Sequence, residues 1–154
     1  MPEAGGRTII KHNMIQEIKL KAYIKQYGEQ WADDLPKNCP PEDVCVANDD
    51  VFFRMTLNED RTVPEDWVNY LTLYPNQNYT DEQRINAAGL SVMDSQEAAE
   101  NKMRLPWMKK RGFKGLAKIS LIPEDGVVLQ TSNETNHFTW WRTKMCNLAK
   151  AKMV

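Results

Sequence analysis

The feature that most constrains the fold lies in the last third of the chain, where a short polar turn separates two apolar segments. Residues 115–122 and 126–131 read as apolar strands, and Pro123-Glu124-Asp125 lies between them, directly before a glycine. A polar turn that ends in glycine favours a hairpin. The sequence therefore predicts two antiparallel neighbours in a sheet.

A third neighbouring strand is predicted over residues 137–142. Successive side chains of a strand point to opposite faces, so His137, Thr139 and Trp141 should share one face. Phe138 and Trp140 should share the other. This strand would place one of only two histidines beside a pair of tryptophans.

Residues 51–57 form another predicted strand, and residues 90–93 a brief one. The even positions of the first carry Phe52, Arg54 and Thr56, whereas the odd positions are all apolar. We therefore expect Arg54 on the less buried face of its strand, next to a phenylalanine.

Helix signals occupy much of the remaining chain. The longest predicted helix runs over residues 13–35 and is apolar on two faces, so it must be covered twice, by this chain or by another one. Capping sequences at residues 62–65, 80–83 and 94–97 open three shorter helices, the second of which should end at Gly89. Residues 143–153 read as a short basic helix.

Length and composition favour one globular domain over residues 1–154, with the first eight to ten residues as a loose tail. Helices and strands without a regular alternation indicate an α+β fold, in which helices, including the long N-terminal one, pack on a mostly antiparallel sheet. Three cysteines without a close pair favour free thiols in a reducing compartment. With no apolar leader and no membrane-spanning run, we expect a cytoplasmic protein without a membrane partner. We also expect no metal and no cofactor, since the cysteines and histidines are scattered.

Charge is separated along the chain although the net charge is only -1. Residues 29–66 carry eleven acidic and three basic side chains, whereas residues 101–123 carry seven basic and no acidic ones. The basic segment 102–118 suits nucleic acid, with Lys109, Lys110 and Arg111 as its centre and aromatic residues nearby for stacking. Two alternatives remain open: the acidic segments screen it within the fold, or it is a solvated face.

A small set of residues suits a phosphate-bearing ligand. Arginine offers a planar fork for an anion, serine donates a hydrogen bond, and histidine serves as donor or base. Arg54, Ser91 and His137 are the candidates, with Trp141 as a stacking partner. Each also has a structural interpretation: Arg54 paired with an acid, Ser91 in a cap or turn, His137 bonded to backbone, and the tryptophan in the core.

Three segments together resemble a family of small bacterial proteins of uncharacterised activity: Phe52-Phe53-Arg54, Gly89-Leu90-Ser91-Val92 and His137-Phe138-Thr139-Trp140-Trp141. The resemblance covers residues 40–142. More loosely, a strand arginine followed by a strand serine is similar to the layout of ADP-ribosyltransferases. In that family the arginine and serine hold NAD and a glutamate activates the acceptor, which implies NAD contacts for Arg54 and Ser91. The glutamate has no clear counterpart, since Glu124 lies in a turn and Glu134 in a loop.

The leading functional hypothesis is a soluble bacterial domain that binds a protein partner or a second copy of itself and catalyses no reaction. This hypothesis rests on two observations: the sequence has no complete catalytic signature, and it has no glycine-rich phosphate loop. One alternative is a nucleotide- or NAD-binding protein, similar to ADP-ribosyltransferases, that uses Arg54 and Ser91. The other is nucleic-acid binding through residues 102–118.

Overall fold

The computed structural model describes residues 15–132 and 135–154, and eight strands within them form one sheet. All neighbouring strands are antiparallel, and their order is β1-β2-β6-β7-β4-β3-β5-β8. The strands are β1 (Gln16–Lys19), β2 (Asp43–Val46), β3 (Asp50–Thr56), β4 (Leu90–Met93), β5 (Gly115–Leu121), β6 (Gly126–Leu129), β7 (His137–Arg142) and β8 (Lys152–Met153). The α+β prediction with an antiparallel sheet is therefore confirmed.

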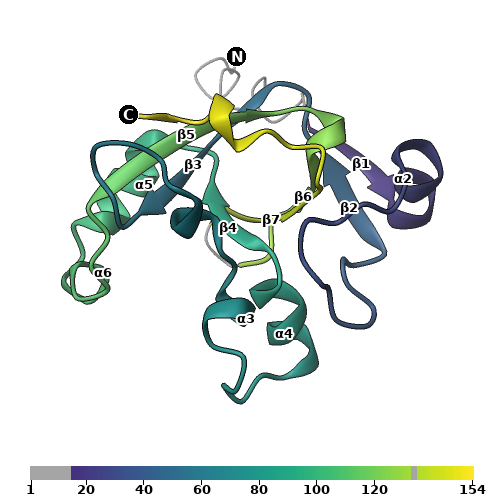
Figure 1. Ribbon diagram of the computed structural model, residues 1–154, viewed down its shortest axis with the longest axis horizontal. Helices are drawn as coiled ribbons and strands as arrows, with labels where there is room; N and C mark the ends of the chain where they lie inside the picture. Colours follow the sequence, from purple (N-terminus) through teal and green to yellow (C-terminus); the bar gives the residue numbers. More distant parts are fainter. Residues whose placement is uncertain (1–14, 133–134) are drawn as a thin grey trace, which may run out of the picture.

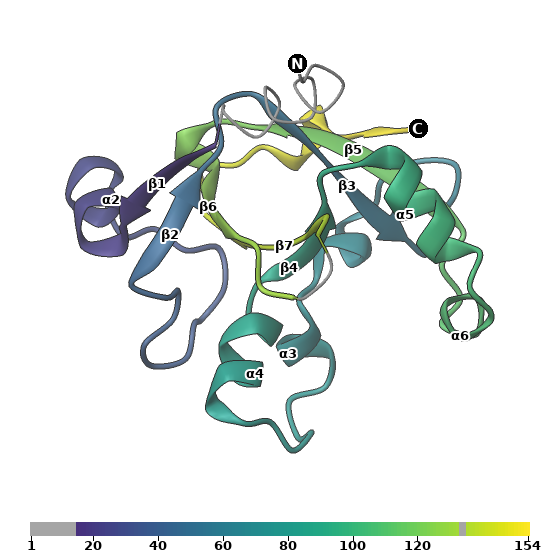
Figure 2. The ribbon, with the colours of Figure 1, turned by 180° about the vertical axis from the view of Figure 1, so that it is seen from behind.

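The helices of the described residues are short. They are α2 (Leu20–Tyr27), α3 (Tyr70–Leu73), α4 (Asp81–Ala87), α5 (Gln96–Met103) and α6 (Pro106–Lys109), with the 3-10 turns η1 (Pro64–Trp67), η2 (Pro123–Asp125) and η3 (Leu148–Lys150). In Figures 1 and 2, α2 lies beside β1 and β2, and α5 lies against β3. The pair α3 and α4 projects away from the strands, near β4.

The sheet is strongly curled, because β5 and β6 are joined only by η2 although three other strands lie between them in the sheet. Four strand spacings in a flat sheet would separate them by about 19 Å. The connection consists of the extended Ile122 and the three residues of η2, which together span only about 10 Å. The two strands must therefore approach each other, and the strands form the ring seen in Figure 1.

Three apolar clusters stabilise this curl. The largest, called the inner cluster below, combines alternate residues of the five strands from β6 to β5, on the side of the sheet that faces away from α2 and α5; its members include Phe52, Leu90, Val92, Ala117, Ile119, Leu121, Val128, Phe138 and Trp140. A second cluster, around Tyr23 and Trp141, packs under α2. A third, around Phe53 and Met93, packs under α5. The sheet is thus apolar on both faces, as its strand sequences require.

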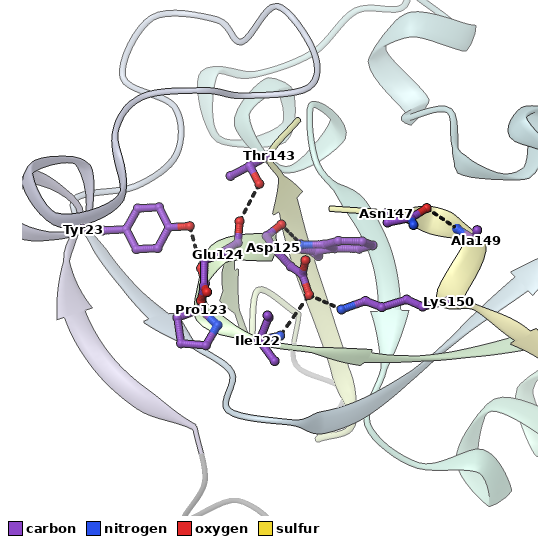
Figure 3. Close-up of polar contacts among 10 residues, drawn as sticks. Tyr23, Ile122, Pro123, Glu124, Asp125, Thr143, Asn147, Ala149 and Lys150 are labelled. Carbon is purple, nitrogen blue, oxygen red and sulfur yellow. Dashed lines mark hydrogen bonds and ion pairs between the residues drawn. The ribbon is translucent and has the colours of Figure 1, made fainter. Parts of the chain in front are cut away.

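The η2 turn is fixed through its own carbonyl oxygens (Figure 3). The Tyr23 hydroxyl donates to the carbonyl of Pro123 at 2.7 Å. Thr143 Oγ1 donates to the carbonyl of Glu124 at 2.6 Å, and Trp140 Nε1 to that of Asp125 at 3.1 Å. Each of three consecutive carbonyls therefore has a side-chain donor, one from α2 and two from the end of β7 and the residue that follows it.

The Asp125 carboxylate also stabilises this turn, through a backbone N–H and an ion pair. Its Oδ2 accepts the backbone N–H of Ile122 at 3.0 Å and forms an ion pair with Lys150 of η3. Asp125 is only 4% exposed, so this charge depends on its partners. The ion pair also places the C-terminal segment so that β8 can pair with β5.

The predicted hairpin of residues 115–122 and 126–131 is wrong, although both strands exist. β5 pairs with β3 and β8, whereas β6 pairs with β2 and β7. The polar turn does not reverse the chain between paired strands; its carbonyls bond to side chains and it closes the ring between β5 and β6. The predicted helix over residues 143–153 is also wrong: this segment forms η3 and β8, because its backbone extends the edge of β5.

The long N-terminal helix is not observed in the described residues. Residues 16–19 form β1, which pairs with β2, and the helix α2 begins only at Leu20. It ends at Gly28, which has φ +85°. The two apolar faces are explained by Ile18, Leu20 and Tyr23 packing into one cluster from a strand and a helix. Residues 13 and 14, and the predicted tail, lie outside the described residues.

Two of the three predicted caps are confirmed. Thr80 and Gln83 form a complete capping box that opens α4, which ends just before Gly89, and Ser95 caps α5. The prediction at residues 62–65 is wrong, because the N-cap is Val63 and only the turn η1 forms. The carbonyls of Asp66 and Val68 accept from the Arg54 side chain instead of from helical N–H groups, which ends this turn early.

Glycine at position 126 is required by both conformation and space. Its φ is +133°, and a Cβ there would lie 2.2 Å from the backbone oxygen of Trp141. We expect Gly126→Ala to lower the free energy of unfolding by more than about 3 kcal/mol, since a backbone clash adds to the strain of positive φ. Gly28→Ala is the matched control, because Gly28 has φ +85° but meets only the flexible Gln30 side chain, at 3.7 Å. It should cost about 1 kcal/mol; equal losses in urea unfolding would contradict this account.

Tyr23 links the ring closure to pH. Burial, followed by the nearby phenol of Tyr27 and the carboxylates of Asp125 and Glu124, raises the pKa of Tyr23. A raised folded pKa stabilises below the unfolded value of about 10 and loses that contribution as pH rises above it. Tyr23→Phe should cost about 1 kcal/mol at neutral pH and make unfolding stability less sensitive to pH above about 9. Urea unfolding across the alkaline pH range is the measurement, and Tyr74→Phe, at an exposed tyrosine, is the control variant.

Candidate functional site

A cleft of about 720 Å³ opens where the strands β3, β4 and β7 meet the segments around η1, α3 and α6. This volume is in the range of small-molecule sites. Its lining mixes basic, hydroxyl and aromatic side chains, and it includes Arg54, Ser91 and His137 together with Lys110, Arg111, Tyr70, Tyr74, Phe113, Thr131 and Thr139. Three of the four predicted ligand-binding residues thus line one cleft, from three different strands.

Arg54 is anchored by backbone carbonyls. Its Nε donates to Asp66 at 2.7 Å, its Nη1 to Ser91 at 2.9 Å and its Nη2 to Val68 at 3.4 Å. The guanidinium also lies 5.9 Å from the ring centroid of Trp67. Desolvation lowers the pKa of Arg54 to about 10, against the opposing effect of the Asp66 carboxylate, so the group remains cationic at neutral pH.

The expectation that Arg54 lies on the less buried face of its strand is wrong. Phe52 and Thr56, which share its face, are almost completely buried. Arg54 is tolerated there because its donors are directed to carbonyls of η1 and β4. It therefore has a structural role, and it also brings a positive charge to the cleft.

Ser91 and His137 contact each other directly. Ser91 Oγ lies 2.5 Å from His137 Nε2, which is a short hydrogen bond. The two residues lie on the paired strands β4 and β7, where Ser91 is opposite Thr139 and Met93 is opposite His137. A second hydroxyl pair, Thr131 Oγ1 and Thr139 Oγ1 at 2.6 Å, lies beside them in the cleft.

The close approach of β7 to the start of β4 depends on Gly89. A Cβ at this position would lie 2.4 Å from Thr139 Cγ2 and 3.1 Å from Trp141 Nε1. Glycine therefore allows the hydroxyl-bearing face of β7 to lie against β4. Asn69 positions the other wall, since its side-chain nitrogen donates to the carbonyl of Ala88 at 2.9 Å while its oxygen caps α3.

The basic segment supplies one side of the cleft. Lys102, Lys110 and Arg111 line it, whereas Lys109, also predicted as a nucleic-acid contact, is exposed and does not. Arg111 lies between two aromatic rings, 5.1 Å from the centroid of Phe113 and 6.0 Å from that of Tyr70. Together with Arg54, these residues give the lining four basic side chains, whereas Glu65 and Asp66 are its two acidic side chains. The Asp66 carboxylate also accepts a backbone N–H at 2.8 Å.

Exposed apolar side chains form the rim of the same cleft. Leu57, Tyr70, Leu73 and Tyr74 are each between 38% and 55% exposed. The rings of Tyr70 and Tyr74 lie 4.6 Å apart, one helical turn from each other along α3. Exposed aromatic pairs of this kind offer a surface on which a planar group can stack.

Trp141 does not line the cleft, so the prediction that it contacts a ligand there is not supported by its position. It shares the face of His137 and Thr139, as the alternation of the strand predicted, but it is 1% exposed and belongs to the cluster under α2. Its Nε1 donates to the carbonyl of Ile85 at 3.0 Å. On this face of β7, His137 and Thr139 line the cleft, whereas Trp141 lies in the core because α4 covers its end of the strand.

Several lining residues were missed by the sequence reasoning. Thr139 lies on the same face of β7 as His137, so the alternation of the strand could have identified it as a lining residue. Tyr70 and Tyr74 have the spacing of one helical turn, which is a usable signal. Thr131 had no signal, because its contact with Thr139 depends on β6 and β7 being neighbours.

The cysteines lie outside the cleft lining. Burial raises the pKa of Cys39 and of Cys146 to about 12, so both thiols are protonated at neutral pH. Among the described residues, no group of three histidine, cysteine or acidic side chains is placed to hold a metal ion. In the same part of the chain, no helix has the length and apolar character needed to cross a bilayer. No family model, no curated protein and no solved structure matches the chain.

The contacts of Arg54 predict a measurable loss of stability on mutation. We expect Arg54→Ala to lower the free energy of unfolding by about 3 kcal/mol, because three carbonyls lose a charged donor. Arg54→Lys should recover part of this loss, since a lysine keeps the charge without the planar fork. Arg84→Ala is the control: that guanidinium lies over Tyr79 at 5.4 Å, a contact worth less than about 1 kcal/mol. Denaturant unfolding of the three variants measures these losses. An Arg54→Ala variant with an unchanged free energy of unfolding would contradict the structural role of Arg54.

Proposed function

We propose that this protein binds a small ligand that combines a phosphate group with an aromatic ring, such as a nucleotide or NAD, in the cleft. One observation carries the proposal. Arg54, Ser91 and His137 line the same cleft as three side chains of the basic segment and an exposed tyrosine pair, although these residues are far apart in the sequence.

The charge of the lining supports an anionic ligand. Arg54, Lys110 and Arg111 contribute positive charge, and Ser91, Thr131 and Thr139 contribute hydroxyl groups. Phosphate oxygens accept strong hydrogen bonds from such donors. The phosphate would lie toward Arg54 and the hydroxyl groups of Ser91, Thr131 and Thr139.

The rim supports an aromatic group at the other end of the ligand. Tyr70, Tyr74 and Phe113 line the cleft, and Arg111 already lies against two aromatic rings. A nucleobase has a π-face that stacks on aromatic side chains and on arginine. A ring without phosphate, or phosphate without a ring, would use only part of this arrangement.

Nucleic acid is the second candidate function, because Lys110, Arg111 and Phe113 combine positive charge with aromatic surface. A single strand would use the same cleft as a nucleotide. The two candidate functions differ in how affinity depends on the length of the ligand. If the protein binds nucleic acid through several phosphates, a short oligonucleotide should bind more tightly than a mononucleotide.

The test is a thermal-shift and calorimetric titration of the whole chain with ADP, NAD, adenosine, inorganic phosphate and a short single-stranded oligonucleotide. We expect ADP or NAD at millimolar concentration to raise the Tm, by mass action on the folded state. Adenosine and phosphate alone should bind more weakly. If none of these ligands shifts the Tm, the proposed function is wrong.

The neighbouring lysines provide a matched pair of variants. Lys110→Ala should weaken ADP binding by about tenfold, because it removes a charged contact worth about 1.4 kcal/mol in the cleft. Lys109→Ala removes the same charge one residue earlier, outside the cleft, and should change the Kd by less than about twofold. Equal effects of the two substitutions would show that binding follows general charge and not this cleft.

A further inference from the structure

We propose that Ser91 is a nucleophile activated by His137, and that the cleft catalyses the hydrolysis of anionic carboxylic esters through an acyl-serine. This departs from the expectation of a non-catalytic domain. It uses the same cleft as the proposed nucleotide site, but it does not depend on nucleotide binding.

The distance between the two side chains is the first support. A serine hydroxyl is a weak nucleophile until a neighbouring base accepts its proton, and the base must lie within hydrogen-bond reach. Ser91 Oγ and His137 Nε2 lie 2.5 Å apart. The imidazole nitrogen is thus placed to take the hydroxyl proton as Oγ attacks.

Accessibility is the second support. Ser91 is exposed although it lies in a strand whose neighbours Leu90 and Val92 are buried. Both Ser91 and His137 line the cleft. On the other side of the imidazole, Nδ1 is buried, so the ring presents Nε2 to the serine and to the cleft.

Rigidity is the third support. Ser91 and His137 come from the adjacent strands β4 and β7, which are held in register by four residue pairs. Catalytic groups on regular elements keep their geometry better than groups on loops. The glycine at position 89 allows this close packing at the start of β4.

Charge defines the substrate class. Arg54 donates to the backbone carbonyl of Ser91 at 2.9 Å and lines the same cleft, so a positive charge lies near the nucleophile and favours an anionic substrate. Lys110 and Arg111 at the cleft attract an anionic substrate. An ester that carries a carboxylate or phosphate group elsewhere in the molecule fits both features.

The reaction balances with water as the only co-reactant. Ser91 Oγ forms a bond to the ester carbonyl carbon while its proton moves to His137 Nε2. The carbon–oxygen bond to the alcohol then breaks, and the alcohol takes that proton. Water attacks the acyl-serine with His137 as base, which releases the carboxylic acid and restores the serine.

The experiment is covalent labelling of the full chain with a fluorophosphonate probe, followed by intact-mass and peptide mass spectrometry. Ser91 Oγ should form a bond to phosphorus as fluoride leaves, so one adduct is expected and it should map to Ser91. Absence of an adduct, or an adduct on another residue, overturns the proposal. This readout uses the wild-type chain and does not require any variant to fold.

Variants then assign the roles. Ser91→Ala should abolish labelling, and His137→Gln should slow it by at least about a hundredfold, the usual effect of a general base. Ser120→Ala, at an exposed serine on β5 outside the cleft lining, should label like the wild type. Labelling of His137→Gln at the wild-type rate would overturn the role of the histidine.

Two further measurements distinguish catalysis from a structural hydrogen bond. The labelling rate should rise with pH and reach a plateau once the imidazole has lost its proton; a rate that keeps rising in proportion to hydroxide would contradict general-base activation. Chromogenic esters with and without a carboxylate should be hydrolysed at different rates, with the anionic ester preferred. Labelling of Ser91 without ADP binding would support this proposal and reject the nucleotide site. ADP binding without labelling of Ser91 would support the nucleotide site and reject this proposal.

Discussion

The bonds to the η2 turn hold together a structure that the backbone alone would leave open. Tyr23, Thr143 and Trp140 each donate to one of three consecutive carbonyls, and Asp125 adds an ion pair with Lys150. These contacts bring β5 and β6 together although the sheet orders them far apart. The inner cluster can exclude water only when the sheet is curled, so hydrophobic burial and these polar contacts support each other.

Arg54 connects this core to the cleft. Its guanidinium lies over Trp67, a residue of the inner cluster, and it bonds to η1 and to β4. The wall formed by η1 and α3 is therefore fixed to the sheet by a charged group, which is costly to bury unless its donors are satisfied. A change in the cleft that disturbed Arg54 would also disturb the core.

Local features of the sequence predicted most of the elements. The alternation in residues 137–142 placed Phe138 and Trp140 in the inner cluster, and His137 and Thr139 in the cleft. The helix starts at residues 80–83 and 94–97 were predicted because a cap depends on residues only three positions apart; the structure gives Thr80 and Ser95 as the two caps. The convergence of Arg54, Ser91 and His137 was only a hypothesis, because strand order decides it and no local pattern encodes that order.

The errors have the same physical origin. Pro123-Glu124-Asp125 has the composition of a hairpin turn, yet distant side chains bond its carbonyls and direct the chain elsewhere. Residues 16–19 have helical spacing, yet they pair with β2 at the sheet edge. Arg54 was expected on the less buried face of its strand, because the distant carbonyls that satisfy its donors are not visible in the local sequence. Tertiary contacts overrode local preference in each case.

The strand order also has consequences for how this chain folds. Among the described strands, three pairs of sheet neighbours are consecutive in the sequence, β1 with β2, β3 with β4 and β6 with β7, and only the last pair is joined by a short connection. Cys45 pairs with Val128, and Phe53 with Lys118, so most of the ring forms between segments separated by long stretches of chain. Closing such loops loses entropy before the contacts are gained, which places this topology among slow folders. The cleft, whose residues come from β3, β4 and β7, exists only after that late closure, so a partly folded chain has the side chains of the site without the site.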